Sequence, residues 1–267
     1  MMNNYCLNCE KNLIDKYCSG CGQKADTHRI TFKNFIFHDV LHGTFHFEKG
    51  MFFTAKQALQ HPGKAALEYI SGKRVRYYNV FYLILITIGL IVFFHHFYDK
   101  LSIGQDDEAL QNPRKLNEAS KIMNEIFTQK SKLIIFLFVP FAALNSFILF
   151  RRKKLNLSEH CIIAGMILLG MLLISALGNL FFCFELIKPF NSDFAYTISM
   201  LVTVLIILHV IYGYYNAFSH DYTKLGIAYR ILLFFALLCF EIMILFIVVW
   251  GFITHWKFGD IKVSPFG

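Results

Sequence analysis

Five apolar stretches follow one another from residue 78 onwards, separated by more polar segments of which 99–132 is the longest. They cover residues 78–98, 133–150, 161–187, 196–215 and 229–253. Each is close to the roughly 20 residues that an α-helix needs to cross a hydrocarbon layer of about 30 Å. Only helices and closed barrels satisfy their backbone hydrogen bonds in lipid. The pattern therefore predicts an all-α integral membrane protein with about five transmembrane helices in residues 78–253.

The third apolar stretch carries small residues along its length: Gly165, Gly170, Ser175 and Gly178. Small side chains let neighbouring helices approach closely within a membrane. We therefore expect the third helix to take a central position.

Other segments alternate apolar and polar positions at helical spacing. Thr31 can cap a helix that starts at Phe32, and Pro62 can open a further helix that Gly72 ends. We predict amphipathic juxtamembrane helices at the membrane interface over residues 28–77. A second such pattern predicts an external amphipathic helix at about 112–130, and a tail of residues 254–267 ends the chain.

Composition supports a membrane location. Of the 267 residues, 56% are hydrophobic and 16% are charged, whereas an ordinary soluble domain has about 25% charged residues. A soluble monomer is excluded. Lys and Arg number 26 against 18 Asp and Glu. Charged residues are too sparse for a dedicated nucleic-acid binder, so we expect no nucleic acid as a partner. We expect the excess of basic residues to face anionic membrane lipid.

Basic residues gather at connections that share one side if the chain crosses the membrane five times. They are Lys73, Arg74, Arg76, Arg151, Arg152, Lys153, Lys154, Lys224 and Arg230. The positive-inside rule then makes this side cytosolic, with a cytosolic N-terminus and a periplasmic C-terminus. The 99–132 loop has six basic and six acidic residues of its own, which weakens the bias.

Four cysteines lie close together near the start of the chain. Cys6-x2-Cys9 and Cys18-x2-Cys21 are two pairs separated by eight residues. Such pairs can present four thiolates to a tetrahedral zinc ion. Because four thiolates fill the coordination shell and leave no position for water, we expect the zinc to be structural. Two disulfides are the alternative, but the chain opens without a basic and apolar leader, which indicates a reducing compartment. Iron also suits four thiolates. We predict a zinc ribbon over residues 1–27.

Short motifs follow the cysteines: Gly22-Gln23, Arg29-Ile30-Thr31, Gly50, Thr54, Pro62-Gly63, Glu68-Tyr69-Ile70 and Gly72-Lys73-Arg74-Val75-Arg76-Tyr77. Over about the first 90 residues this opening resembles an uncharacterised bacterial membrane family catalogued as domain of unknown function 3667. The resemblance implies a cytosolic zinc ribbon fused to a multi-span inner-membrane part. It implies no activity and no catalytic residue. The family often has proline shortly after the basic motif, where this chain has Asn79-Val80.

Residues 72–78, here called the basic–aromatic segment, lie just before the first apolar stretch. Lys73, Arg74, Arg76 and Tyr77 suit the lipid headgroup interface, where cations meet an anionic leaflet. Two interpretations stay open. The segment is either an ordinary topological anchor or a pocket for a lipid headgroup or phosphate.

His38, His42 and His46 recur at four-residue steps, with Asp39 beside the first. On a continuous helix the three imidazoles would share one face, so they form a candidate for a second metal site. The alternative is a polar face on an interfacial helix, and Gly43 weakens that helix.

Four polar side chains fall inside the predicted spans: Asn145, Asn179, His209 and Glu241. They either form a polar ladder for protons or a small solute, or make interhelical hydrogen bonds. His209 and Glu241 differ in predicted depth by about 9 Å at 1.5 Å per residue, so we expect no direct pairing between them.

The sequence contains no phosphate-binding glycine loop, serine nucleophile elbow or dinucleotide fingerprint. An enzyme therefore has little support. The leading hypothesis is a bacterial inner-membrane protein whose zinc ribbon is a docking or regulatory module, with a possible protein partner. The alternatives are a transporter or channel using Glu241, His209 and Asn179, and a lipid-acting membrane enzyme.

Overall fold

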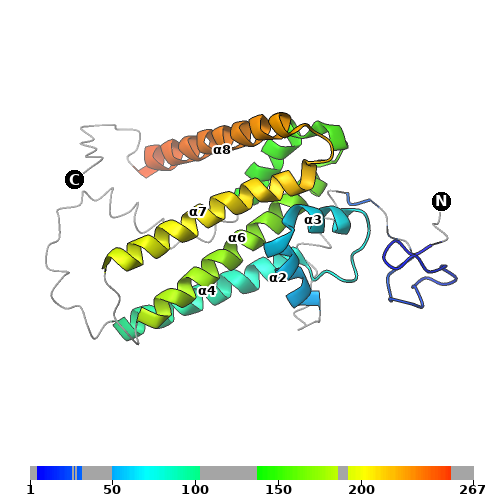
Figure 1. The fold of residues 1–267 in the computed structure, drawn as a ribbon, viewed down its shortest axis with the longest axis horizontal. Helices are drawn as coiled ribbons and strands as arrows, with labels where there is room; N and C mark the ends of the chain where they lie inside the picture. Colours follow the sequence, from blue (N-terminus) through cyan, green and yellow to red (C-terminus); the bar gives the residue numbers. More distant parts are fainter. Residues whose placement is uncertain are drawn as a thin grey trace.

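The computed structural model describes residues 5–25, 27, 29–31, 50–102, 137–185 and 192–253. These residues form helices joined by turns, preceded by an N-terminal module with two isolated β-bridges. The elements are α2 (Gly50–Gln60), α3 (Pro62–Ile70), α4 (Val80–Ser102), a helix over Leu137–Leu149, the 3-10 turn η2 (Arg151–Lys153), α6 (Leu157–Glu185), α7 (Ser192–Phe218) and α8 (Lys224–Ile253) (Figure 1).

Some predicted elements lie outside the described residues. They are the helix beginning at Phe32, the external helix at about 112–130 and the tail 254–267. These three elements therefore remain predictions from the sequence.

Three of the helices are long and apolar enough to cross a membrane. They cover Leu157–Phe181, Tyr196–Phe218 and Lys224–Phe252, and two shorter apolar helices cover Val80–Phe94 and Leu137–Leu149. The all-α class and the multi-pass membrane character predicted from the sequence are therefore confirmed. Each of the five predicted stretches overlaps one of these helices. Five crossings remain a prediction.

Helix α6 occupies the centre of the bundle, between α4 and α7 (Figure 1). In the most apolar part of each helix, 72% of the α6 residues are buried, against 17% in α7 and 11% in α8. Small residues permit this position. A Cβ atom on Gly178 would come within 2.8 Å of Val202 Cγ2 in α7, and one on Gly165 within 3.2 Å of Phe81 Cζ in α4. The expected central place of the third span is confirmed.

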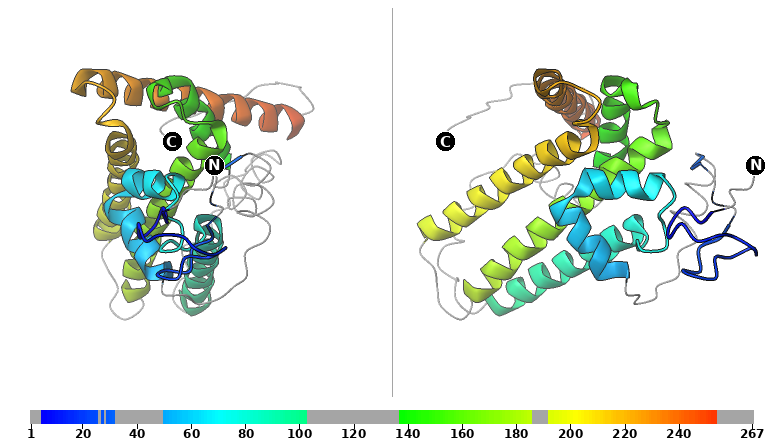
Figure 2. Two further views of the ribbon diagram at one scale, coloured as in Figure 1. Left: turned by 90° about the vertical axis from the view of Figure 1, so that its right-hand side faces the viewer. Right: turned by 45° about the vertical axis from the view of Figure 1, so that its right-hand side comes forward.

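Helices α2 and α3 form a hairpin that packs into the bundle against α6 and α7 (Figure 2). The position of this segment at the membrane interface remains a prediction. Small residues explain this packing: a Cβ atom on Gly63 would clash with the backbone N of Ala217 and the backbone O of Gly213 in α7. Ala58 and Ala66 are fully buried. The hairpin therefore fits into α6 and α7 backbone to backbone.

The tip of the hairpin hydrogen-bonds to polar side chains of α7. Asn216 Oδ1 accepts the Lys64 N–H at 2.7 Å, and Tyr212 OH lies 3.0 Å from His61 Nδ1. The first N–H groups of a helix have no partner within that helix. Asn216 therefore caps α3 from a neighbouring helix, which lets the start of α3 lie against an apolar bundle.

An aromatic cluster joins the later helices at the end of the bundle that carries the N-terminal module. Phe150 stacks on Phe218 with ring centroids 4.3 Å apart and on Tyr214 at 5.8 Å, and Tyr214 contacts Phe234 at 4.5 Å. The cluster connects the turn after Leu137–Leu149 to α7 and α8. Away from it α8 diverges, and it lies on the opposite side of the molecule from α4 (Figures 1 and 2).

Candidate metal centre

The N-terminal module is built from two knuckles with the same backbone pattern. In the first, the Cys6 N–H donates to Lys11 O at 2.8 Å, and in the second the Cys18 N–H donates to Gln23 O at 2.8 Å. One β-bridge closes each knuckle, between Tyr5 and Asn12 and between Tyr17 and Lys24. The repeat presents the two cysteine pairs to each other in equivalent ways.

Each knuckle turns through one residue with left-handed backbone, four positions after its first cysteine. These residues are Glu10, with φ 63°, and Gly22, with φ 75°. Gly22 suits this tight turn, because glycine accepts positive φ without steric cost. Gly20 does not have positive φ. Instead its N–H donates to Cys18 Sγ at 3.4 Å.

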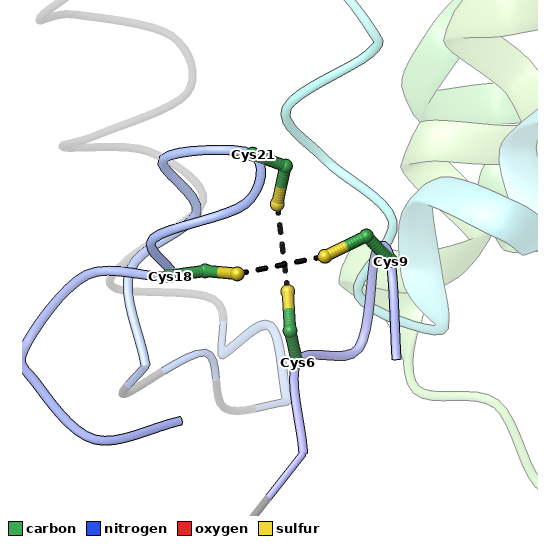
Figure 3. A group of neighbouring side chains, drawn as sticks. All are labelled: Cys6, Cys9, Cys18 and Cys21. Atoms are coloured by element: carbon green, nitrogen blue, oxygen red, sulfur yellow. Dashed lines mark hydrogen bonds between the residues drawn. The ribbon is translucent and has the colours of Figure 1, made fainter. Parts of the chain in front are cut away.

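The four cysteine sulfurs converge on one point (Figure 3). All four Sγ atoms lie within 4.8 Å of one another. The distance is 3.5 Å for Cys6 to Cys21 and for Cys9 to Cys18. Ligands about 2.3 Å from a tetrahedral zinc lie about 3.8 Å apart, whereas a disulfide has sulfurs about 2.05 Å apart. The cluster consists of free thiols and is suitable for a metal ion.

The backbone favours the thiolate form of one ligand. The hydrogen bond from the Gly20 N–H to Cys18 Sγ lowers the pKa of this thiol to about 6. A thiolate, rather than a thiol, binds metal. Cys18 is therefore a ready ligand at neutral pH.

The module rests on the turn between α3 and α4. Gln23 is 4% exposed, and its Nε2 donates to Gly72 O at 2.7 Å. Leu7 packs on the same residue, since a Cβ atom on Gly72 would lie 2.7 Å from Leu7 Cδ1. Gly72 also has φ 106°. Glycine is thus required there both for the backbone conformation and for the close approach of the module.

A second contact ties the segment after the module to the start of α6. Arg29 Nε lies 2.7 Å from Glu159 Oε1, and its Nη2 donates to Glu159 Oε2 at 2.8 Å and to Lys154 O at 2.9 Å. Asn156 Nδ2 donates to Ile30 O at 2.8 Å. The Glu159 side chain is 3% exposed. A planar guanidinium that meets a carboxylate with two hydrogen bonds makes a strong and directional contact.

Glu159 is a contact residue that was not predicted from the sequence. Asn156 and Glu159 form a reciprocal capping box at the N-terminus of α6: the Glu159 N–H donates to Asn156 Oδ1 at 2.9 Å, and the Asn156 N–H donates to Glu159 Oε2 at 2.8 Å. An Asn-x2-Glu pattern before an apolar run is the signal that predicts such a cap. No local signal pairs Glu159 with Arg29.

The basic–aromatic segment makes contacts within the protein. Tyr77 is buried against Phe53, with ring centroids 5.3 Å apart, and its OH donates to Glu68 Oε2 at 2.9 Å. Burial and this hydrogen bond raise the pKa of Tyr77. Arg76 Nη1 lies 3.5 Å from the same carboxylate oxygen.

Arg74 and Lys73 are the other two cations expected at the interface. The Arg74 guanidinium lies 5.7 Å from the Tyr69 ring centroid. Both side chains are half-buried at the surface. They therefore stand beside the turn on which the N-terminal module rests.

The structure joins two of the four polar side chains predicted inside the spans. Asn145 Nδ2 donates to Glu241 Oε2 at 2.8 Å. Asn179 Nδ2 instead bonds to Ser175 O of its own helix at 3.0 Å. His209 is 6% exposed, and its Nε2 has no hydrogen-bond partner among the described residues. His38, His42 and His46 lie outside those residues.

These features define a multi-pass membrane protein with an N-terminal four-cysteine module. Residues 48–92 match the sequence model of the family described as Protein of unknown function (DUF3667), which confirms the resemblance over that segment. The matched segment contains α2, α3, the basic–aromatic segment and the first part of α4. No curated protein and no solved structure matches the chain.

Proposed function

We propose that the chain is a bacterial inner-membrane protein with five spans, whose cytosolic zinc ribbon is a docking or regulatory module for the membrane bundle. The contact of Gln23 and Leu7 with Gly72 carries this proposal. It joins the metal-binding module to the α3–α4 turn beside the membrane entrance.

Zinc suits the cluster because four thiolates fill a tetrahedral shell. A segment of about twenty residues buries too little apolar surface to fold alone, so the metal supplies its folding free energy, on the order of 10 kcal/mol. Cys6, Cys9, Cys18 and Cys21 would hold the ion, and the closed shell makes its role structural.

Metal binding is then linked to the membrane part. Gln23 and Leu7 reach Gly72 only when their knuckles are folded, and the knuckles fold only around the ion. A protein partner of the ribbon would meet a surface whose position depends on zinc. In this proposal, zinc binding therefore controls whether the ribbon docks on the cytosolic face of the bundle.

Clustering of the basic connections supports a cytosolic position for the ribbon. Lys153 Nζ lies 3.0 Å from Asp221 Oδ2, the Arg152 N–H donates to Tyr222 OH at 3.0 Å, and Lys154 O accepts from Arg29. The second-to-third and fourth-to-fifth connections therefore meet at the end where the ribbon is attached. Positive charge on one side favours the cytosol.

Metal analysis of the purified protein tests the proposal. We expect one zinc per chain by elemental mass spectrometry, and loss of that zinc when Cys18 and Cys21 are both changed to Ser. Hydrogen exchange around Gly72 should then become faster. Cys161→Ser is the matched control, because Cys161 is buried in α6 away from the cluster.

Two results would contradict the proposal. One is wild-type protein without metal. The other is unchanged protection around Gly72 in the zinc-free variant, because docking would then not depend on the metal. Labelling of residues 5–25 from the periplasmic side would overturn the orientation separately.

The transporter alternative has less support. Glu241 is paired with Asn145, and Asn179 bonds to its own helix, so among the described residues these groups share no hydrogen-bonded path with His209. Flux in proteoliposomes that is lost on Glu241→Gln would favour transport. The lipid-acting enzyme would need His38, Asp39 and His42 near Lys73 and Arg74, and the three former residues lie outside the described ones.

A further inference from the structure

Two arginines from distant parts of the chain lie against one buried tyrosine. Tyr222, 7% exposed, has the Arg152 Cζ atom 4.8 Å and the Arg230 Cζ atom 4.2 Å from its ring centroid. Arg152 belongs to η2 and Arg230 to the second turn of α8. Cation–π contacts of this kind hold a guanidinium in place without neutralising its charge.

Backbone carbonyls hold both guanidinium groups further. Arg152 Nη1 donates to Asp221 O at 2.8 Å, and Arg230 donates from Nε to Leu149 O at 3.1 Å and from Nη1 to Gly226 O at 2.9 Å. These acceptors are uncharged. A guanidinium has five N–H donors in a rigid fork that matches the oxygens of a phosphate. The pair is thus pre-organised, and both charges are kept.

The surrounding charge is strongly positive. Segments 150–154 and 219–230 contain six Lys and Arg residues and one carboxylate, Asp221. The six are Arg151, Arg152, Lys153, Lys154, Lys224 and Arg230. The Asp221 carboxylate lies 3.0 Å from Lys153 Nζ. Bringing like charges together costs free energy, which a bound anion would offset.

An apolar cavity lies between the same two helices that Arg230 connects. Arg230 bonds to Leu149, the last residue of the Leu137–Leu149 helix. This helix and α8 enclose about 140 Å³, lined by Leu137, Phe138, Phe141, Leu238, Ile242, Leu245 and Phe246. Leu238 to Phe246 are 8 to 16 residues beyond Arg230, or about 12 to 24 Å along α8. One leaflet of hydrocarbon is about 15 Å thick, so an acyl chain from a headgroup at Arg230 reaches the part of the cavity nearest to it, at Leu238.

We propose that this site binds an anionic phospholipid, with its phosphate on Arg152 and Arg230 and an acyl chain in the cavity. The charge selects an anionic headgroup, and the cavity selects a lipid over a free phosphate. The proposal is independent of the zinc ribbon and of its role.

Native mass spectrometry of the full-length protein in detergent tests the site, with phosphatidylglycerol and phosphatidylcholine as probes. We expect wild type to retain one phosphatidylglycerol at concentrations where phosphatidylcholine is lost. Changing Arg152 and Arg230 together to Gln should weaken phosphatidylglycerol binding by about tenfold or more, because each cation near an anionic headgroup contributes about 1 kcal/mol. Lys56→Gln with Lys64→Gln is the matched control, which removes two exposed cations of α2 and α3 outside the cluster and should change binding less than about twofold.

Leu238→Trp tests the cavity while both arginines are kept. We expect it to weaken phosphatidylglycerol binding by filling the space of the acyl chain. Equal loss in the control pair would overturn the site, because net charge would then be enough. If the arginine variants do not fold, wild-type competition decides: equal retention of both lipids, or displacement of the lipid by millimolar inorganic phosphate, would overturn the proposal.

Discussion

Arg29 and Glu159 are 130 residues apart in sequence and form a two-pronged ion pair, with N–O distances of 2.7 and 2.8 Å. The same carboxylate accepts a hydrogen bond from the N–H of Asn156, the residue just before α6. One acidic side chain thus caps the central helix and holds the segment that follows the metal module. The contact physically joins the N-terminal module to the membrane bundle.

Arg29→Ala should lower the free energy of unfolding by about 1–2 kcal/mol. The Glu159 carboxylate would remain buried with its charge uncompensated, although the exposure of Arg29 lets water replace part of the loss. Thermal unfolding in detergent measures the change. Lys154→Ala removes a nearby positive charge but leaves its backbone carbonyl in place, so an equal effect of the two substitutions would contradict the specific pair.

Gly63→Ala should destabilise the packing of the α2–α3 hairpin by about 2–3 kcal/mol or more, because the new methyl group meets backbone atoms of α7 that cannot move aside. Gly89→Ala in α4 is the control. Nothing lies within 4 Å of a Cβ atom there, so it should be neutral or raise stability by up to about 1 kcal/mol. Thermal unfolding compares the two proteins. Similar stability of both would rule out the tight backbone contact.

Gly22→Ala should weaken zinc binding about fivefold, because a side chain at φ 75° costs about 1 kcal/mol. Gly20→Ala should cost less. Its Cβ atom would lie 3.0 Å from Lys11 Cδ, on a flexible side chain, and at ordinary contact distance from Cys9 Sγ (3.5 Å) and Cys18 Sγ (3.7 Å). The N–H that bonds to Cys18 is kept. Competition with a zinc chelator gives both affinities. A larger loss for Gly20→Ala would refute the assigned turn geometry.

Asn145 and Glu241 should show a coupling free energy of about 0.5–2 kcal/mol in a double-mutant cycle, because they share a hydrogen bond between two helices. The cycle uses Asn145→Ala, Glu241→Ala and the combined variant, with unfolding measured in detergent. Pairing Asn179→Ala with Glu241→Ala provides the control, since Asn179 bonds to its own helix. Additive effects for Asn145 and Glu241 would show that their contact contributes no stability.

The α2–α3 hairpin shows where sequence patterns stop being informative. The pattern around Pro62 predicted a helix there, and α3 begins at Pro62. Its apolar face could equally cover a membrane surface or a neighbouring helix, because periodicity identifies a buried face and not what buries it. In the structure Gly63 lies against the backbone of Gly213 and Ala217, so α7 covers this part of α3.

The sequence by itself determined the features that depend on short spacing. Cys6-x2-Cys9 and Cys18-x2-Cys21 predicted a four-thiol cluster, because each knuckle closes through bonds between residues a few positions apart. The apolar stretches predicted the helices, because length and hydrophobicity are local properties. Only the tertiary structure decided that Arg29 meets Glu159 and that Asn145 meets Glu241. A pairing across about a hundred residues depends on how whole helices pack, which local periodicity does not encode.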